Sequence, residues 1–414
     1  MGIHSNGTSS SNGLPQRSVY LDHAATTPML PEVLEAMLPY FTERFGNPSS
    51  VHAWGRAAHQ GMENARRQVA AVLGCRPREV VFTSGGTEAD NFAMKGVAWA
   101  YRRGAFPAKQ PSQGPGHIII SAIEHHAILH SAEDLEQHGF EVTVLPVDKQ
   151  GMVNPDDVGK AMRADTILVS IMYANNEIGT VQPIKAIADI AHSQGALFHT
   201  DAVQAGGALD MDVQCLGADL LSLSAHKFYG PKGVGVLYVK ANTPLLPIQH
   251  GGSQESRRRA STENVPGIVG LGAALHRAHQ NMTSEGQYVQ SLRDRLVSGI
   301  MGRIDRVHFM GHAESRLPNN ANFCIEGVDG ETMLLKLDMR GIGASSGAAC
   351  ASGSTEPSHV LRAIGVPRDL AQGSLRLTVG IDNTPEDIEY TLDVLEGCVA
   401  DLRTGTVSAV AGTA

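Results

Sequence analysis

Short apolar runs alternate with helical patterns between about residues 30 and 240, and this alternation limits the possible folds more than any other feature of the sequence. Seven runs have the character of buried strands: VVFTS from residue 80, HIIIS from 117, EVTVLPV from 141, TILVSIM from 166, ALFHTD from 196, DLLSLS from 219 and VGVLYV from 234. Strands separated by helices pair mostly in parallel, with the helices packed on the faces of the sheet. The pattern therefore predicts an α/β fold built on a mainly parallel sheet.

The rhythm changes beyond residue 265, where a long helical pattern precedes two strand-like runs, NNANFCIEG and SLRLTVG. Helices separate these runs, so we predict a smaller α+β domain in this part of the chain. The stretch 101–116 is rich in Pro, Gly and Gln and is predicted to be an exposed loop. We find no internal repeat of solenoid period.

Composition and charge exclude several classes of function. The chain has 414 residues, 42% of them hydrophobic, and its formal net charge of −9 gives no support for binding nucleic acid or an anionic membrane. Residues 1–16 are predicted to be a disordered tail rather than a targeting signal, and no apolar run approaches the ~20 residues that span a bilayer. The five cysteines are widely spread without a CxxC pair, which is typical of reduced thiols and not of a zinc site. We therefore expect a cytoplasmic protein without a metal.

One lysine, Lys227 in SAHKFYGPKG, stands between two apolar strands. A lysine at a strand end is most often a solvated surface residue, and this alternative stands for the residue taken alone. Open α/β sheets, however, bind their ligands at the carboxyl ends of strands. A desolvated lysine there can form a Schiff base with a carbonyl, and pyridoxal phosphate (PLP) is the commonest partner of such a lysine.

Two further segments complement such a cofactor. FTSGGTEADN is a glycine turn that leads from a strand into a helix beginning near Thr87, where free N–H groups and the hydroxyls of Ser84 and Thr87 would bind a phosphate. HTDAVQ ends a strand on Asp201, whose carboxylate would keep a pyridine nitrogen protonated, an ion pair worth about 4 kcal/mol at an effective dielectric constant near 20. The alternatives are an ordinary strand-to-helix turn and, for Asp201, a helix N-cap.

Three more polar segments are candidates for the same site. In EHHAI, one of His125 and His126 could stack on a planar cofactor, the alternative being a solvated or core histidine. ANNEIGT offers the polar residues 175–177 as turn formers or as contacts to the cofactor. Gly, Ala and Ser surround Cys350 in GASSGAACASGSTEPSH, whereas a buried structural cysteine normally has bulky apolar neighbours. We predict that Cys350 is a reactive nucleophile.

Taken together, these segments resemble the cysteine desulfurases, PLP-dependent enzymes of fold type I in the class V aminotransferase group, and more closely their NifS and IscS branch. The resemblance extends from YLDHAATTP at residue 20 to EDIEYTLDVL near 395. Its most specific motifs are GNPSSVH, FTSGGTEADN, EHHAI, ANNEIGT, HTDAVQ, SAHKFYGPKG and SSGAACASGSTEPSHVLRA. It implies a large PLP-binding domain with a mainly parallel seven-stranded sheet, residues 29–275, and a smaller α+β domain, residues 17–28 and 276–404. The smaller domain carries the Cys350 loop, and residues 405–414 form a second tail.

The resemblance also implies a role for each candidate residue. Lys227 carries the cofactor as a Schiff base. The other residues implied to contact the cofactor are Gly86, Thr87, Ser224 and His226 at the phosphate, His125 stacked on the ring, Asp201 at the ring nitrogen, Gln204 at the ring hydroxyl and Asn176 at a cofactor oxygen. Asn176 and Arg376 are implied to bind the substrate, Arg376 by gripping its carboxylate. Thr262 is implied to reach the phosphate of a neighbouring subunit, which implies a homodimer, and Ser261 stands where the family usually has glycine.

The activity implied by the resemblance is that of a cysteine desulfurase. Lys227 removes the Cα proton of L-cysteine, and Cys350 attacks the substrate sulfur. The products are L-alanine and a persulfide on Cys350, which passes to a sulfur-acceptor protein such as an iron–sulfur scaffold. A selenocysteine lyase and a class V aminotransferase are alternatives, as is a non-catalytic scaffold with this fold. Release of sulfide or alanine from cysteine separates a desulfurase from an aminotransferase, and a yellow colour excludes the scaffold.

Overall fold

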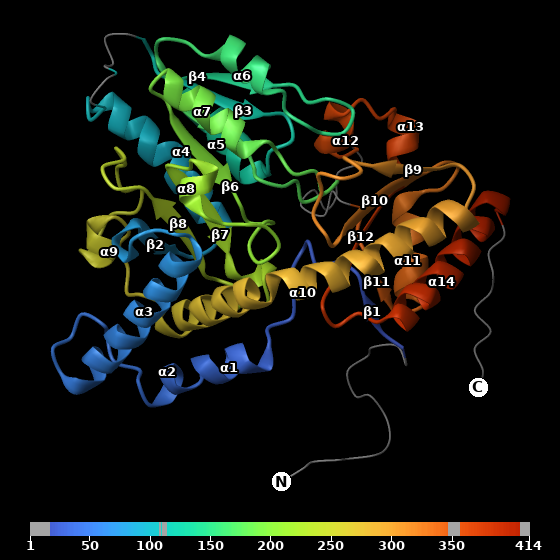
Figure 1. The fold of residues 1–414 in the computed structure, drawn as a ribbon, viewed down its shortest axis with the longest axis horizontal. Coiled ribbons are helices and arrows are strands. Elements are labelled where there is room, and N and C mark those ends of the chain that lie inside the picture. Colours follow the sequence, from blue (N-terminus) through green and yellow to red (C-terminus); the bar gives the residue numbers. More distant parts are fainter. Residues whose placement is uncertain (1–16, 107–108, 110–113, 347–356, 406–414) are drawn as a thin grey trace.

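The structure of the protein, a computed structural model, describes residues 17–106, 109, 114–346 and 357–405. Its largest element is a seven-stranded sheet with the strand order β2-β8-β7-β6-β5-β3-β4 (Figure 1). The strands are β2 (Val80–Thr83), β3 (His117–Ser121), β4 (Glu141–Leu145), β5 (Thr166–Ser170), β6 (Leu197–Asp201), β7 (Leu220–Ser224) and β8 (Gly235–Val239). The two pairings of β8 are antiparallel and the other four are parallel. The predicted α/β fold with a mainly parallel sheet is confirmed, and each of the seven predicted runs contains one of its strands.

Side chains of this sheet alternate between two apolar layers, as the period of two in a β-strand requires. In β2, Val80 and Phe82 point into one layer and Val81 into the other. The helices of the first layer are α1 (Pro31–Met37), α3 (Ala53–Val72), α7 (Ile184–Ser193) and the first half of α10 (Val265–Arg303). Those of the second layer are α4 (Gly86–Arg102) and α5 (His126–Gln137). Because both faces of the central strands are covered, these strands are rich in apolar residues, which made them easy to predict.

Short helices complete this part of the molecule. They are α2 (Pro39–Thr42), η1 (Pro77–Glu79), α6 (Pro155–Ala161), α8 (Val213–Leu216), η3 (Ala225–Lys227) and α9 (Gln254–Arg257). Lys227 ends η3, directly after β7, so the strand-end position predicted for this lysine is confirmed.

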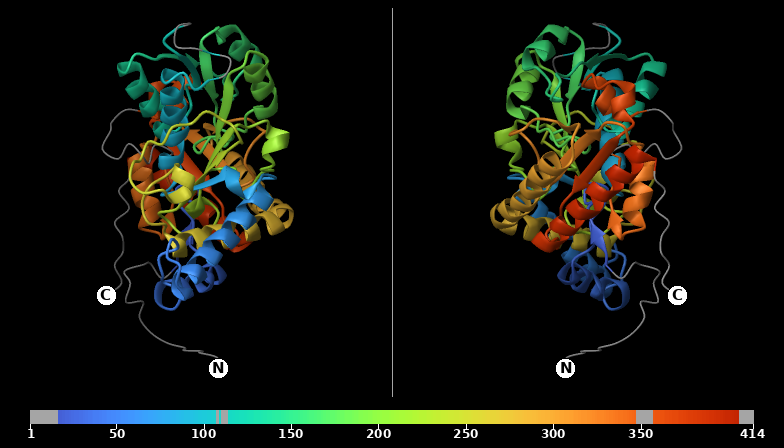
Figure 2. Two further views of the ribbon diagram at one scale, coloured as in Figure 1. Left: turned by 90° about the vertical axis from the view of Figure 1, so that its left-hand side faces the viewer. Right: turned by 90° about the vertical axis from the view of Figure 1, so that its right-hand side faces the viewer.

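The long helix α10 connects the large sheet to a second cluster of buried residues (Figures 1 and 2). This cluster surrounds a three-stranded antiparallel sheet with the order β12-β10-β9. The elements here are β9 (Val307–Met310), β10 (Asn320–Ile325), α11 (Gly330–Asp338), β11 (Ile342–Gly343), α12 (His359–Ala363), α13 (Arg368–Ala371), β12 (Ser374–Thr378) and α14 (Pro385–Thr404). The N-terminal strand β1 (Val19–Tyr20) pairs with β11, and Val19 and Leu21 join the same cluster. The boundaries given above for the two domains stay a prediction.

The prediction that 101–116 is an exposed loop is wrong for four of its described residues, because Tyr101, Phe106, Lys109 and Gly116 are buried. Tyr101, Phe106 and Lys109 are 1%, 4% and 5% exposed. Tyr101 still belongs to α4, and its ring meets Phe106 edge-on with 5.8 Å between ring centroids. The Tyr101 hydroxyl donates to Gly114 O over 2.9 Å and Lys109 Nζ to Ala164 O over 2.9 Å. The segment therefore covers the second apolar layer. Its Pro and Gly content predicted a loop, but burial of its large apolar side chains stabilises it against this layer.

Several predictions concern residues outside the described ranges. These are the two tails, most of 107–113 and Cys350 with its flanking residues 347–356. Within the described ranges, Cys75, Cys215, Cys324 and Cys398 are free thiols. No helix in those ranges is both long and apolar enough to cross a membrane.

Candidate active site

A cavity of about 460 Å³ lies at the carboxyl ends of the parallel strands, between the large sheet and β12. It collects side chains that follow five different strands, as expected for an open α/β sheet. Ten residues singled out from the sequence line it: Gly86, Thr87, His125, Asn176, Asp201, Gln204, Ser224, His226, Lys227 and Arg376. Residues 290 positions apart in the chain thus meet in one place, which sequence spacing alone cannot establish.

Lys227 points toward the N-terminal segment of the chain. Its Nζ donates to the carbonyl oxygens of Ala24 and Ala25 over 2.5 Å and 2.7 Å. Gln204 Nε2 donates to the same Ala24 oxygen over 3.0 Å, so one short backbone segment orients both side chains. The amine is thereby fixed at the wall of the cavity.

One end of the cavity is suited to an anion. Helix α4 begins there at Gly86, and in the described ranges no side chain caps it, so the N–H groups of its first turn are available. A Cβ atom at Gly86 would lie 2.7 Å from Val203 Cγ2, so only glycine fits between this turn and the loop after β6. Burial, with the charges of Lys227 and Lys232, lowers the pKa of His226 to about 4, so this histidine is neutral at pH 7. Ser84, also predicted at the phosphate, does not line the cavity; its N–H donates to Glu88 Oε2 over 2.7 Å.

The floor of the cavity holds two buried carboxyl groups. Burial raises the pKa of Asp201 and of Asp90, and repulsion by Asp201 raises the pKa of Asp90 further. Asp201 Oδ1 accepts from Val203 N over 2.9 Å and so caps a turn, but no helix begins here among the described residues, so the alternative of a helix N-cap is wrong. Asp90 Oδ1 is buried and has no hydrogen-bond partner in the described part of the chain. Such carboxyl groups favour a ligand that brings a positive charge or a proton to this floor.

His125 faces the cavity and His126 does not. His125 precedes α5 as its N-cap, and its Nδ1 accepts from Ala127 N over 3.1 Å. Burial, followed by the charges of Lys227, His126 and His130, lowers the pKa of His125 to about 4. His125 is therefore a neutral ring at pH 7, suited to stacking on a flat ligand. His126 packs on His130 and His359, with ring centroids 4.9 Å and 4.8 Å apart.

Arg376 forms the opposite wall. It is 2% exposed, and it donates from Nη1 to Asn176 O over 3.0 Å and from Nη2 to Asp22 Oδ1 over 2.7 Å. Its Nε is buried without a hydrogen-bond partner among the residues described. An unpaired buried N–H of a cation is costly, so this guanidinium favours an anionic ligand such as a carboxylate.

The polar residues 175–177 were considered as turn formers or as contacts to the cofactor, and the structure shows both kinds of position among them. Asn176 lines the cavity. Asn175 is a turn former, because its Oδ1 accepts from the N–H groups of Glu177 and Ile178. The Glu177 carboxylate accepts from Ser358 Oγ, so it contacts α12 rather than the cavity.

Two predicted site residues are not in this cavity. Thr262 is exposed, and the preceding Ser261 has a φ of 99°, a conformation that favours the glycine usual at this place. Cys350 lies outside the described ranges. None of the four described cysteines lines the cavity, and burial raises the pKa of Cys75 and Cys324 to about 12.

The chemistry of the cavity fits pyridoxal phosphate. A helix N-terminus suits its phosphate, a floor of buried carboxyl groups suits its pyridinium nitrogen, and a lysine amine suits its aldehyde. Within the described ranges, no group of three or more His, Cys, Asp or Glu side chains is arranged to hold a metal ion.

Sequence reasoning missed three features of the site: Asp90, Asp22 and the carbonyls of Ala24 and Ala25. Asp90 could have been found, because it is three residues after Thr87 and therefore on the same face of α4. Asp22 and the alanines belong to the motif YLDHAATTP, but nothing local indicates that this segment crosses to the large sheet.

Comparison with known proteins identifies the family. Residues 19–391 match the family described as aminotransferase class-V. The chain is 52% identical over 389 residues to the cysteine desulfurase IscS of Dictyoglomus turgidum, covering 94% of this chain and 96% of that protein. A solved NifS-like protein is 38% identical with a TM-score of 0.85, covering 93% of this chain and 100% of its own. The structure of SspA in complex with cysteine is 36% identical with a TM-score of 0.75, covering 88% of this chain and 99% of its own. The chain therefore belongs to the class V aminotransferase family and, within it, to the NifS- and IscS-like cysteine desulfurases, which depend on pyridoxal phosphate.

Proposed function

We propose that this cysteine desulfurase binds pyridoxal phosphate and L-cysteine together in the 460 Å³ cavity and transfers the cysteine sulfur to Cys350. The observation that supports the proposal most is that ten residues to which the family resemblance assigns a role line this one cavity. A non-catalytic scaffold would have no reason to keep them together.

The cofactor would be held from three sides. The first turn of α4, with Thr87, Ser224 and His226, binds its phosphate. Asp201 and Gln204 would contact the ring, and neutral His125 would stack on it. When bound, pyridoxal phosphate supplies an electrophilic carbon for an amino group and a ring that accepts electrons from the substrate Cα.

The residues around the substrate divide the work. Arg376 and Asn176 hold the carboxylate of L-cysteine, and Lys227 Nζ takes the Cα proton. The Cys350 thiolate then attacks the substrate sulfur: an S–S bond forms, the Cβ–S bond breaks, and its two electrons stay with the substrate carbon. Cβ takes up the proton lost by Cys350, Lys227 returns the proton to Cα, and L-alanine leaves, so Cys350 keeps the persulfide.

Partners follow from this chemistry. The related structure of SspA in complex with cysteine supports cysteine as the substrate. We further propose transfer of the persulfide sulfur to an acceptor protein, such as an iron–sulfur scaffold, in the cytoplasm.

A homodimer is supported by the distribution of exposed apolar side chains. Six of the twelve large hydrophobic residues exposed in the described ranges lie between residues 34 and 54: Leu34, Leu38, Phe41, Phe45, Val51 and Trp54. We name these six side chains the 34–54 patch. Exposed apolar side chains concentrated in one stretch of the chain are typical of an interface, and a second copy of this chain would cover them.

The function is tested with L-cysteine and mass spectrometry. We expect one additional sulfur on the peptide that contains Cys350, removable by a reductant, and alanine in solution. Cys350→Ser should retain the cofactor colour and lose alanine formation, because a hydroxyl is far less nucleophilic than a thiolate. Sulfur found on another cysteine, or a serine variant with wild-type turnover, would refute the role of Cys350. A serine variant that still acts on selenocysteine would favour a selenocysteine lyase.

A further inference from the structure

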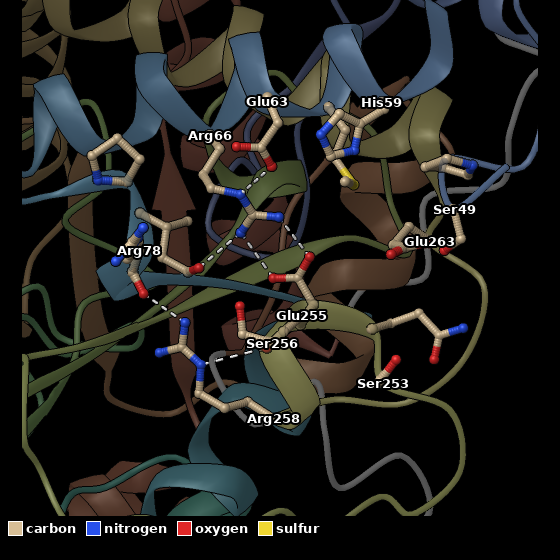
Figure 3. Close-up of a pocket in the computed structure, with 15 residues that line it drawn as sticks. Ser49, His59, Glu63, Arg66, Arg78, Ser253, Glu255, Ser256, Arg258 and Glu263 are labelled. Atoms are coloured by element: carbon tan, nitrogen blue, oxygen red, sulfur yellow. Dashed lines mark hydrogen bonds and ion pairs between the residues drawn. The ribbon is translucent and has the colours of Figure 1, made fainter. Parts of the chain in front are cut away.

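A second pocket, of about 400 Å³, lies outside the cofactor cavity between α3, η1 and the segment 253–263 (Figure 3). Two ion pairs fasten this segment to the strand and turn that lead into α4. We propose that the pairs Arg66–Glu255 and Glu88–Arg259 position residues 84–87, here called the phosphate turn, and thereby set the affinity for the cofactor phosphate. The inference rests on the proposed cofactor site, but it concerns residues outside that site.

The first pair is buried and bidentate. Arg66 on α3 and Glu255 on α9 point toward each other (Figure 3), and their side chains are 10% and 2% exposed. Arg66 Nη2 donates to Glu255 Oε1 over 2.6 Å, and Nη1 donates to Oε2 over 2.9 Å. Burial by itself would lower the pKa of Arg66, but the hydrogen bonds and charges of Glu255 and Glu63 outweigh it, so its pKa is raised. The pair is a fixed charged fork rather than a surface contact.

This pair also holds the strand before the phosphate turn. Glu255 Oε2 accepts from Phe82 N over 3.0 Å, and Arg66 Nη1 donates to Val80 O over 2.8 Å. The Arg66 guanidinium lies 4.7 Å from the centre of the Phe82 ring. Three contacts therefore fix β2 against α3 and α9, the last of them at Phe82, two residues before the turn begins.

The second pair holds the turn itself. Arg259 donates from Nε and Nη2 to the two oxygens of Glu88 over 2.8 Å and 3.1 Å. Glu88 Oε2 also accepts from Ser84 N over 2.7 Å. Burial would raise the pKa of Glu88, but the bonds from Arg259 and Ser84 outweigh it and lower that pKa, so the group is an anion. Arg259 is therefore part of a structural link between the segment 253–263 and α4.

Backbone strain in the segment indicates that these contacts hold it in an unfavourable conformation. Glu255, Ser256 and Arg257 have φ angles of 45°, 57° and 66°, in the left-handed region. Residues other than glycine visit this region as single residues, rarely three in succession. Such strain persists where surrounding contacts fix the conformation, and it occurs often near functional sites.

Phosphate affinity should depend on this link for a geometric reason. N–H groups at a helix start bind an anion only when they converge on it. The two carboxylates accept from Phe82 N and Ser84 N, on either side of Thr83, and so set the direction in which the chain enters α4. If either ion pair is lost, the chain can enter α4 in more than one direction, and the N–H groups of the phosphate turn no longer converge on the phosphate.

The test uses the full-length apoprotein and two probes, pyridoxal phosphate and unphosphorylated pyridoxal. We expect Glu255→Gln and Glu88→Gln each to weaken pyridoxal phosphate binding by about tenfold or more, because each loses charged hydrogen bonds. Pyridoxal affinity should stay within about twofold of wild type, since the proposal concerns the phosphate alone. Hydrogen exchange of the Phe82 and Ser84 amides in the apoprotein should become faster in Glu255→Gln and Glu88→Gln respectively.

Glu79→Gln is the matched control. Measured over the whole residue, Glu79 and Glu255 are both 8% exposed. The Glu79 carboxylate likewise accepts hydrogen bonds from main-chain N–H groups, those of Arg76 and Ala241. It adjoins the opposite end of β2, so its loss should leave phosphate affinity unchanged. If Glu255→Gln does not fold, Arg66→Lys keeps the charge, loses the fork and is measured in the same way.

Two results would overturn the inference: wild-type affinity for pyridoxal phosphate in a folded Glu255→Gln or Arg66→Lys variant, or an equal loss in Glu79→Gln. Failure of the wild-type apoprotein to bind pyridoxal phosphate would instead refute the cofactor site.

Discussion

Asp201 and Asp90 show how single residues set the charge of the active site. The third buried carboxyl group nearby, Glu124, has its pKa raised to about 8 by burial, so it is largely neutral at pH 7. His199 lies 3.8 Å from Asp90 Oδ1, but burial lowers its pKa to about 3, so it supplies no positive charge. Lys227 is the cation that favours ionised Asp201. A cofactor with a protonated ring nitrogen would add a second one.

We expect Asp201→Asn to retain pyridoxal phosphate and to lose turnover by about 100-fold or more, because a neutral amide cannot hold the ring nitrogen protonated. Cofactor content from absorbance and alanine production measure the two effects separately. Asp189→Asn, in an exposed pair with Lys185, is the control and should be fully active. Normal turnover of Asp201→Asn would show that the electron sink does not depend on this carboxylate.

Arg376→Lys tests the substrate carboxylate site. Lysine keeps the charge but cannot donate a planar pair of hydrogen bonds, so we expect KM for cysteine to rise by about tenfold or more, with a smaller change in kcat. Arg316→Lys controls for the replacement of a buried arginine, because Arg316 is 7% exposed and donates to main-chain carbonyls away from the cavity. An unchanged KM in Arg376→Lys would place the carboxylate elsewhere.

Among the elements, α12 is attached to the strand ends that carry the site. The Ser358 hydroxyl, which caps α12, donates to the Glu177 carboxylate after β5. His359 Nε2 contacts Glu124 O, just before His125, over 2.9 Å. The helix that follows the Cys350 segment is therefore fastened to the turns that present Asn176 and His125.

The burial of Glu177 should make stability depend on pH. Burial raises the pKa of Glu177 from 4.5 to about 7. Between these values the folded chain holds a proton that the unfolded chain has released, so stability falls as pH rises through this window and levels off above it. We expect wild type to lose about 2 kcal/mol more than Glu177→Gln between pH 5 and 7.5, seen as a larger fall of the urea midpoint. Glu136→Gln, at an exposed position on α5, should follow wild type; parallel profiles for Glu177→Gln and wild type would contradict the raised pKa.

For the whole molecule, the 34–54 patch should decide the oligomeric state. In Figure 1, α1 and α2 lie at the edge of the molecule beneath α10, so a second copy can reach them. We expect Phe41→Glu combined with Phe45→Glu to give monomers in light scattering, because two buried charges would disrupt an apolar interface. Pyridoxal phosphate binding should weaken as well, if Thr262 reaches the partner's phosphate. Leu335→Glu alters a side chain that is 61% exposed on α11 and should leave the dimer intact. A double variant that stays dimeric would place the interface elsewhere.

Local patterns were sufficient for the strands of the large sheet and for the chemical nature of most site residues. Buried strands are short runs rich in apolar residues, and the glycine turn before α4 and the lysine after β7 have signatures within ten residues. The strands β1 and β11 were missed because each has two residues, too few for a periodic pattern. β9 was missed because three of its four residues are only partly buried or exposed.

Long-range contacts required the folded chain. The pairing of Arg376 with Asp22 joins residues 354 apart, and that of Lys227 with Ala24 joins residues 203 apart. Two other features also depend on long-range contacts. Tyr101 and Lys109 are buried where a loop was predicted, and Glu255 is linked to Phe82. Residue type and spacing determine which chemical groups one segment places on the same face or at the same end of an element, because the backbone geometry of a helix or strand depends only on nearby residues. Which groups meet, and how far burial shifts their pKa values, depends on packing between segments distant in sequence, and no local pattern contains that information.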